Sequence, residues 1–236
     1  MRKPDAKRLN HAIDALMVAF LPMLMAYSLI GETFHEIAGT IMFVLFLLHQ
    51  WFHRKWWKAL TKGRYTPYRI FITILNIALL VLMFMQPLSG IALSKHLYTG
   101  LSLTGLAAAA REIHMLLAYW SYVLMSLHLG VHMDAMVKAI SRKRKAYDTK
   151  PGFLKVASAA ISAYGIYAFI RRGFPGYMLM QTMFAFFDYG EPRLYFFIDY
   201  LAIMVLFATC GYLAALLLKR SNAVSVLKQK FRGGFE

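Results

Sequence analysis

Two sets of three histidines repeat the same spacing in separate parts of the chain. The first set is His35, His49 and His53, and the second, 79 residues later, is His114, His128 and His132. A small residue follows the first histidine of each set by four positions, as Gly39 and Ala118. Imidazole is the commonest metal ligand among side chains. The repeat therefore predicts metal chemistry rather than unrelated core histidines.

The distance between the first two histidines of each set fits one face of a helix. Fourteen residues of α-helix rise about 21 Å and complete nearly four turns, so both side chains face about the same way. If the two segments cross a membrane in the same direction, His35 lies level with His114. His49 then lies level with His128. The spacing predicts two facing pairs of imidazoles, one near each membrane surface.

A pair of facing imidazoles can fill both axial positions of a haem iron, which suits electron transfer. We therefore predict two non-covalent b-type haems with bis-histidine ligation. The small residues Gly39 and Ala118 would let the haem macrocycle approach the helix backbone. His53 and His132 lie one turn beyond the inner pair. We expect them to contact haem propionates, line a quinone pocket or be hydrated. The alternative for all six is hydrogen bonding between helices.

Long apolar helices must position these histidines. The chain has 236 residues, of which 59% are hydrophobic and 16% charged, and a positive mean hydropathy, unlike a soluble domain. The apolar segments predict six membrane spans: 12–30, 35–52, 70–93, 112–133, 153–170 and 194–218. We expect an all-α membrane protein, with a four-helix haem-binding transmembrane bundle in residues 1–138. Residues 139–236 would add a basic cytoplasmic loop, two further transmembrane helices and a basic tail.

Basic residues cluster on one side of these predicted spans. The clusters lie within 1–11, 53–69, 134–155 and 219–232. The positive-inside rule makes that side cytoplasmic, so both termini are expected in the cytoplasm. The net charge of +16 then reflects topology and attraction to lipid headgroups, not nucleic-acid binding. The stretch 173–193 is expected to lie in the outer interface or to dip back into the membrane.

Four segments carry a resemblance to bacterial di-haem cytochrome b-like integral membrane proteins, a family of unknown function related to the formate dehydrogenase γ subunit. They are HEIAGTIMFVLFLLH, SGIALSKHLYTG, HMLLAYWSYVLMSLHLGVH and FFDYGEPRLYFFIDYLA. The resemblance covers most of the chain and implies a multi-pass protein of the bacterial inner membrane. It also implies electron exchange between quinone and a partner redox protein, as a subunit of an oxidoreductase complex. His53 departs from the family pattern, where a polar residue such as Asn is expected.

Acidic residues flank the outer histidines and suggest proton chemistry. The sequence lacks a flavin or nicotinamide motif, so a quinol or quinone is the expected electron carrier. Glu36 or Glu112 could accept a quinol proton, or both could be acids favoured by a helix N-terminus. His96 is another candidate for quinone contact. Asp199 is expected at the outer interface, paired with Arg193, or in a proton relay.

Two other classes of function stay open. One is a transition-metal transporter lined by histidines, and the other is a non-catalytic membrane anchor with structural haem. A transporter is expected to add intramembrane carboxylates or broken helices at its midplane. The segments 35–52 and 112–133 have no carboxylate at their centres. An anchor would not need haems at two depths.

Overall fold

A computed structural model describes the backbone of residues 3–101, 104–143, 151–182, 184 and 187–232, and the side chains of 7–101, 105–133, 156–182, 184 and 187–221. These residues form α-helices and two short 3-10 helices, without any strand. The helices are α1 (Lys3–Met25), α2 (Tyr27–Ile30), α3 (Glu32–Phe52), α4 (Lys55–Ala59), α5 (Pro67–Leu93), η1 (Thr99–Leu101), η2 (Thr104–Leu106), α6 (Ala107–Lys143), α7 (Pro151–Arg171), α8 (Phe174–Met178) and α9 (Arg193–Arg232). The all-α class predicted from the sequence is confirmed.

Each predicted span falls on a long helix. The first span corresponds to α1 and α2, which are separated at Ala26. Helices α6 and α9 extend well beyond the predicted spans, to Lys143 and Arg232. Their polar ends continue the helix outside the apolar stretch that defined each span. The side chains of the basic segment 134–155 and of the tail from 222 onward lie outside the described residues.

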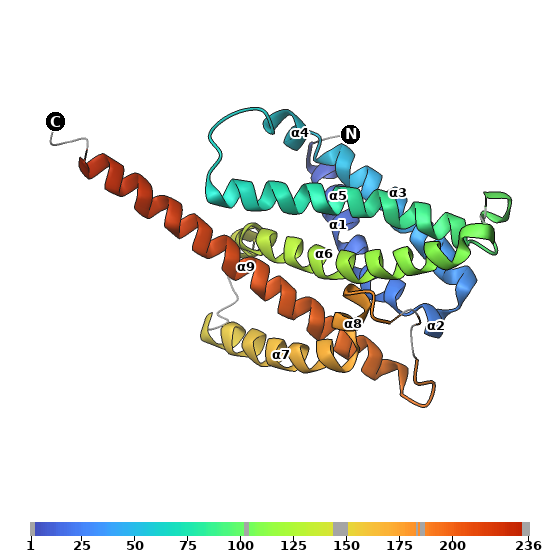
Figure 1. The fold of residues 1–236 in the computed structure, drawn as a ribbon. Helices are drawn as coiled ribbons and strands as arrows, with labels where there is room; N and C mark the ends of the chain where they lie inside the picture. Colours follow the sequence, from blue (N-terminus) through green and yellow to red (C-terminus); the bar gives the residue numbers. More distant parts are fainter. Residues whose placement is uncertain (1–2, 102–103, 144–150, 183, 185–186, 233–236) are drawn as a thin grey trace.

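The helices pack in two connected groups. Helix α3 packs against α1 and α5, and α5 packs against α6. Helix α9 packs against both α6 and α7, so it joins α7 to the rest of the molecule. Figure 1 shows α5 and α6 with nearly parallel axes, the long α9 crossing α6 obliquely, and α7 beside α9. The crossing of α9 over α6 fixes how the second group sits on the first.

Glycines make the α9 crossings close. A Cβ atom added to Gly130 of α6 would lie 1.8 Å from the carbonyl oxygen of Ala208, and one on Gly211 of α9 would lie 2.2 Å from that of Leu127. On α7, a Cβ at Gly165 would lie 2.5 Å from the Ala202 carbonyl oxygen. These backbones approach each other because no side chain separates them, the packing mode typical of membrane helices.

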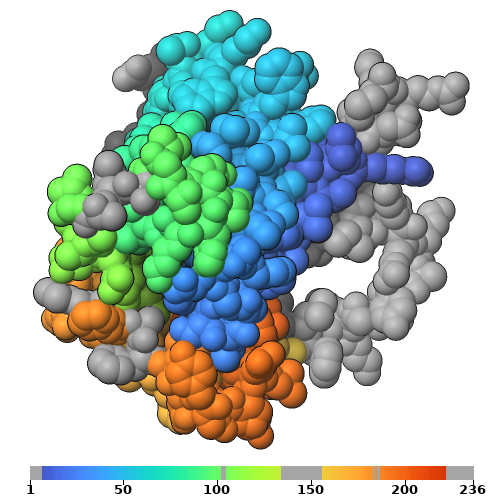
Figure 2. All heavy atoms as spheres, turned by 90° about the vertical axis from the view of Figure 1, so that its right-hand side faces the viewer, coloured from blue at the N-terminus to red at the C-terminus, as the bar shows by residue number. Residues whose placement is uncertain are grey.

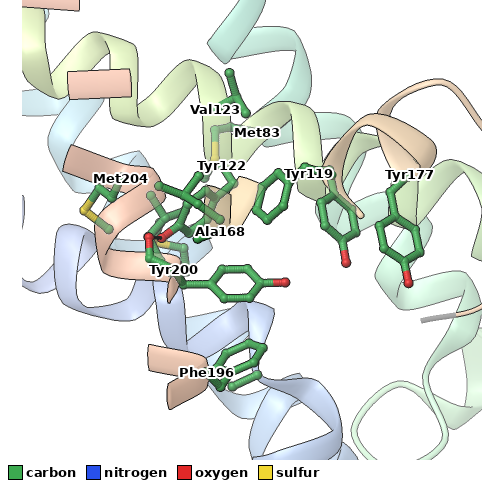
Figure 3. Packing of buried hydrophobic residues seen from close by; sticks show 14 of the residues in the cluster. Met83, Tyr119, Tyr122, Val123, Ala168, Tyr177, Phe196, Tyr200 and Met204 are labelled. Carbon is green, nitrogen blue, oxygen red and sulfur yellow. Dashed lines mark hydrogen bonds between the residues drawn. The ribbon is translucent and has the colours of Figure 1, made fainter. Parts of the chain in front are cut away.

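Aromatic and aliphatic residues from seven of the described helices fill the main core. Tyr122, Phe174 and Ile203 are fully buried there, and part of this core is seen in Figure 3. The buried Tyr122 hydroxyl donates to the Tyr200 carbonyl oxygen at 2.6 Å, so its O–H group has a hydrogen-bond partner. Ser126 likewise donates to the Tyr122 carbonyl oxygen at 2.7 Å. These two buried hydroxyls are thus paired, as burial favours.

Two of the described helices are long and apolar enough to cross a membrane by length and composition: α5 and the part of α9 from Arg193 to Ser221. Val156–Arg171 is a shorter apolar helix. Helix α5 also exposes a stripe of large apolar side chains with alternating spacings of three and four residues. The stripe comprises Ile70, Ile74, Ile77, Val81, Phe84 and Leu88. An exposed apolar stripe of this kind suits contact with lipid.

Candidate functional site

The structure brings His35 and His114 together at one end of the molecule. His35 lies in the first turns of α3, and His114 lies near the start of α6. Their ring centroids are 6.1 Å apart and their planes are inclined by 72°. Two imidazole nitrogens that each hold a metal at about 2 Å place the ring centroids roughly 6 Å apart. The observed separation matches that distance, but both nitrogens of the His114 ring contact polar groups of α5.

Helix α5 holds the His114 ring from the side. Gln86 Nε2 donates to His114 Nε2 at 3.2 Å, so Nδ1 carries the proton of the neutral ring. His114 Nδ1 then donates to Ser89 Oγ at 3.0 Å, and Ser89 donates onward to the Gln86 carbonyl oxygen at 2.9 Å. Metal-binding histidines commonly have Nδ1–H fixed in this way, which leaves Nε2 as the ligand atom. In this structure His114 Nε2 faces the Gln86 amide. A Cβ at Gly90 would lie 3.3 Å from the His114 ring, so this glycine makes room for it.

The opposite imidazole has an unused polar atom. The Nδ1 atom of His35 is buried and has no hydrogen-bond partner among the described residues. The Tyr27 ring packs edge-on against His35, with centroids 5.2 Å apart. A buried nitrogen without a partner is costly in a folded protein. Coordination of a metal by the His35 ring would be one way to offset that cost.

The inner histidines lie on α3 and α6 at the end opposite to His35 and His114. His49 Nδ1 and Asp14 Oδ1 of α1 are 2.8 Å apart, so the imidazole donates to the carboxylate. His53 caps α3, and its Nε2 accepts a 3.4 Å hydrogen bond from Asn10. The His49 and His53 rings lie 4.5 Å apart between centroids. One ligand atom from each of Asp14, His49 and His53 lies within 4.8 Å of the others, a spacing that could hold a metal ion.

Helix α6 likewise brings two histidine rings close together. The His128 and His132 centroids are 4.6 Å apart, nearly the separation of His49 and His53. With its amide oriented to satisfy both neighbours, Asn76 donates to His128 Nδ1 at 3.0 Å and accepts from Trp56 Nε1 at 3.3 Å. The four histidines lie near one another at this level. Polar groups of neighbouring helices contact His49, His53 and His128.

The two levels are separated by an apolar region. Met42 and Phe46 of α3 and Met83 of α5 are buried there. Phe84 packs edge-on against Phe46, with centroids 5.7 Å apart. A Cβ at Gly39 would only reach ordinary contact with Leu24, at 4.0 Å. Gly39 therefore faces α1, and the close approach beside an outer imidazole is made by Gly90 instead.

Glu36 holds the loop that follows α5. Its carboxylate accepts hydrogen bonds from Ser94 Oγ at 2.8 Å and from three backbone N–H groups: Lys95 at 2.9 Å, His96 at 3.3 Å and Leu97 at 2.8 Å. Figure 2 shows this end of the molecule, where the blue start of α3 lies against the green loop. These contacts assign Glu36 a structural role, and its action as a proton acceptor stays a prediction.

Glu32 ties down the same loop. Its carboxylate accepts from Lys95 Nζ at 2.8 Å and from the Tyr27 hydroxyl at 2.6 Å. The hydrogen bond from Lys95, followed by that from Tyr27, lowers the pKa of Glu32 to about 2. His96 Nε2 lies 3.6 Å from this carboxylate, so the loop histidine faces an acid rather than an open site.

Glu112 lies in a different environment. It lines a cavity of about 40 Å³, together with Met115, Tyr177 and Thr182. That volume holds about one or two water molecules. A proton released near Glu112 could reach solvent through such water, and this role too stays a prediction. Ala118, half-buried on α6, lies one turn after His114.

Sequence reasoning missed the residues that orient the histidines. Asp14, Gln86, Ser89 and Asn76 come from α1 and α5, which carry no repeated histidine. Only the polar character of these residues inside apolar segments could have marked them, since such residues usually serve a purpose in a membrane helix.

Comparisons with protein-family models, curated proteins and solved structures find no match for this chain.

Proposed function

We propose that the chain is a membrane di-haem cytochrome b subunit that transfers electrons between the quinone pool and a partner redox protein. The observation that carries the proposal is the approach of the His35 ring of α3 to the His114 ring of α6. The 6.1 Å separation of these two rings matches the distance expected for two imidazoles that share a metal. The resemblance to bacterial cytochrome b-like membrane proteins points to the same chemistry.

The outer haem would be held by His35 and His114. Bound there, haem would supply one-electron redox chemistry. Ser89 fixes the Nδ1 proton of His114 and Gly90 makes room for its ring. Gln86 occupies the Nε2 side of the ring, so its amide must turn aside when a ligand binds.

The inner haem would be held by His49 and His128. Asp14 accepts the Nδ1 proton of His49, a carboxylate–histidine pair that makes the imidazole more basic and fixes its orientation. His53 and His132 lie one turn farther toward the surface, where their contacts would be with haem propionates, quinone or water. The apolar layer between the two levels keeps water away from the path between them.

The proposed setting is the bacterial inner membrane, crossed six times with both termini in the cytoplasm. The four-helix haem-binding bundle would occupy residues 1–138, and residues 139–236 would supply the basic loop, two further spans and the tail. Apart from α5 and α9, the spans rest on their apolar sequences and on exposed apolar faces such as Phe34, Ile37, Ile41 and Val44 of α3.

A second candidate function follows from the inner level alone. The cluster of Asp14, His49 and His53 offers two nitrogens and an oxygen within reach of one ion. That donor set suits zinc and other borderline transition metals. The chain would then be a histidine-lined metal transporter. A membrane anchor with structural haem is the remaining alternative.

Purification from cells supplied with both haem precursors and zinc distinguishes these functions. We expect two haems per chain by pyridine haemochrome assay, a reduced-minus-oxidised spectrum of b-type haem, and reduction by decylubiquinol. A colourless protein that retains zinc would favour the transporter. Haem that no quinol reduces would favour the anchor.

A further inference from the structure

A cavity of about 480 Å³ opens beside α6, α8 and α9, away from the histidine pairs. It is lined by Tyr119 of α6, Tyr177 of α8, and Phe196 and Tyr200 of α9, together with residues 171–173. His114 and Tyr119 are five residues apart on one helix, which places them about one and a half turns apart and on different faces. The cavity is therefore a separate site that shares a helix with the outer pair.

The walls of the cavity are flat aromatic rings. Tyr119 and Tyr177 stack with centroids 4.4 Å apart, and Phe196 and Tyr200 stack with centroids 4.2 Å apart. In Figure 3 these four rings stand around a common space, and the hydroxyl ends of the three tyrosines point toward it. Such walls favour a planar aromatic ligand, because rings bind by offset stacking and edge contacts.

Arg172 supplies a hydrogen-bond donor at the cavity. Its Nε atom donates to Asp199 at 2.7 Å, and Nη1 donates to Glu191 at 2.7 Å. Its Nη2 atom is buried and has no hydrogen-bond partner among the described residues. The guanidinium also lies 5.5 Å from the centroid of Phe196. Because buried donors are normally paired, an acceptor oxygen on a ligand fits this position.

Paired charges at the cavity disfavour an anionic ligand. Arg171 donates to Glu191 at 2.6 Å and to Asp199 at 3.4 Å, so the two arginines share two carboxylates. Asp188 also lines the cavity. The positive charge of the guanidinium groups is therefore already neutralised. A neutral ring with carbonyl or hydroxyl oxygens meets this environment better than a phosphate or a carboxylate.

The position of the cavity suits a ligand that arrives through lipid. It lies where α7 ends, at Arg171, and where α9 begins, at Arg193. In the proposed topology this is the outer end of both spans. A volume of about 480 Å³ is within the range of pockets that bind small molecules.

We propose that this cavity binds the headgroup of a quinone or quinol, with an oxygen of the ring accepting from Arg172 and the ring lying among the tyrosines. The choice of a quinone among neutral aromatic ligands rests on the proposed electron-transfer function. Binding itself depends only on the cavity. The site is distinct from His53, His132 and His96, where the sequence had suggested quinone contacts.

Calorimetric titration of the purified full chain in detergent with decylubiquinone tests the proposal. Tyr119→Phe removes a hydroxyl from the cavity while keeping the ring, and should weaken binding by about fivefold, the effect of one hydrogen bond. Tyr195→Phe is the matched control. It removes an exposed hydroxyl on α9 from a residue that does not line the cavity, and should leave the affinity unchanged.

Arg172→Lys provides a second probe, because it keeps the charge but removes the free Nη2 donor. It should weaken decylubiquinone binding at least as much as Tyr119→Phe. Equal affinities in wild type and Arg172→Lys would overturn the proposal. So would binding of dihexanoyl-phosphatidylglycerol in place of decylubiquinone, which would identify a lipid site. Haem content measured on the same samples separates the two proposals: haem without quinone binding here refutes only the cavity, and quinone binding without haem refutes only the cytochrome function.

Discussion

Asp199 is fully buried on α9 and should be essential to the attachment of α7. Its carboxylate accepts from Arg172 Nε at 2.7 Å, from Arg171 Nη1 at 3.4 Å and from the Tyr164 hydroxyl at 2.5 Å. Asp199→Asn keeps the size of the side chain but removes its charge. Arg172, whose side chain is only 16% exposed, then loses one of its two counter-charges.

The expected cost follows from the remaining contacts. Removing one partner of a buried ion pair costs about 3–5 kcal/mol. Because Arg172 keeps Glu191 at 2.7 Å, we expect the lower end of that range, about 3 kcal/mol. For a chain of this length, the midpoint of thermal unfolding should fall by roughly 6–12 °C. Circular dichroism melting in detergent, at one fixed scan rate, measures the shift.

Asp188→Asn is the matched control for this prediction. Asp188 is exposed, and its carboxylate accepts from the nearby Gly190 N–H at 2.9 Å. Its substitution should change the free energy of unfolding by less than about 0.5 kcal/mol. If Asp199→Asn has the same melting temperature as Asp188→Asn and wild type, the buried charge cluster does not hold α7 against α9. That result would refute the reasoning.

Three further predictions concern the outer loop and the helix crossing. Glu36→Ala should speed amide hydrogen exchange at 95–97, because three N–H groups lose their acceptor; unchanged exchange would contradict the assigned role. The lowered pKa of Glu32 stabilises the fold above pH 4.5, and that contribution should be lost as the pH falls from 4.5 toward 2. Glu32→Gln should reduce the slope of melting temperature against pH in this interval. An unaltered slope would argue against a stabilising role of the Glu32 carboxylate. Gly130→Leu should lower the melting temperature by more than Gly39→Ala does. A Cβ atom at position 130 would overlap the Ala208 carbonyl oxygen, whereas one at position 39 would make only ordinary van der Waals contact. Equal shifts in melting temperature would rule out the close crossing of α6 and α9.

The sequence predicted the helices well because hydropathy records which stretches can be buried or face lipid. The bounds were less accurate where a helix continues into polar sequence, as in α6 to Lys143 and α9 to Arg232. The meeting of His35 with His114 followed from helical periodicity and a parallel arrangement of two segments. Both are properties of local sequence and chain direction.

Side-chain partners were harder to predict, because they depend on how helices rotate against each other. Asp199 was expected to pair with Arg193 or to act in a proton relay, and its partners are Arg171, the last residue of α7, and Arg172 directly after it. Six residues of helix turn through about 600°, so positions 193 and 199 point in different directions. In the same way, the contact of Asp14 with His49 depends on the packing of α1 against α3, which no spacing within either helix reveals.

Haem content of a single ligand variant tests the central claim most directly. His114→Ala removes the ring that Gln86 and Ser89 orient, and should leave one haem per chain where wild type has two. His96→Ala, on the outer loop facing Glu32, should keep both haems. Equal haem content in His114→Ala and wild type, or wild-type protein without haem, would contradict the account.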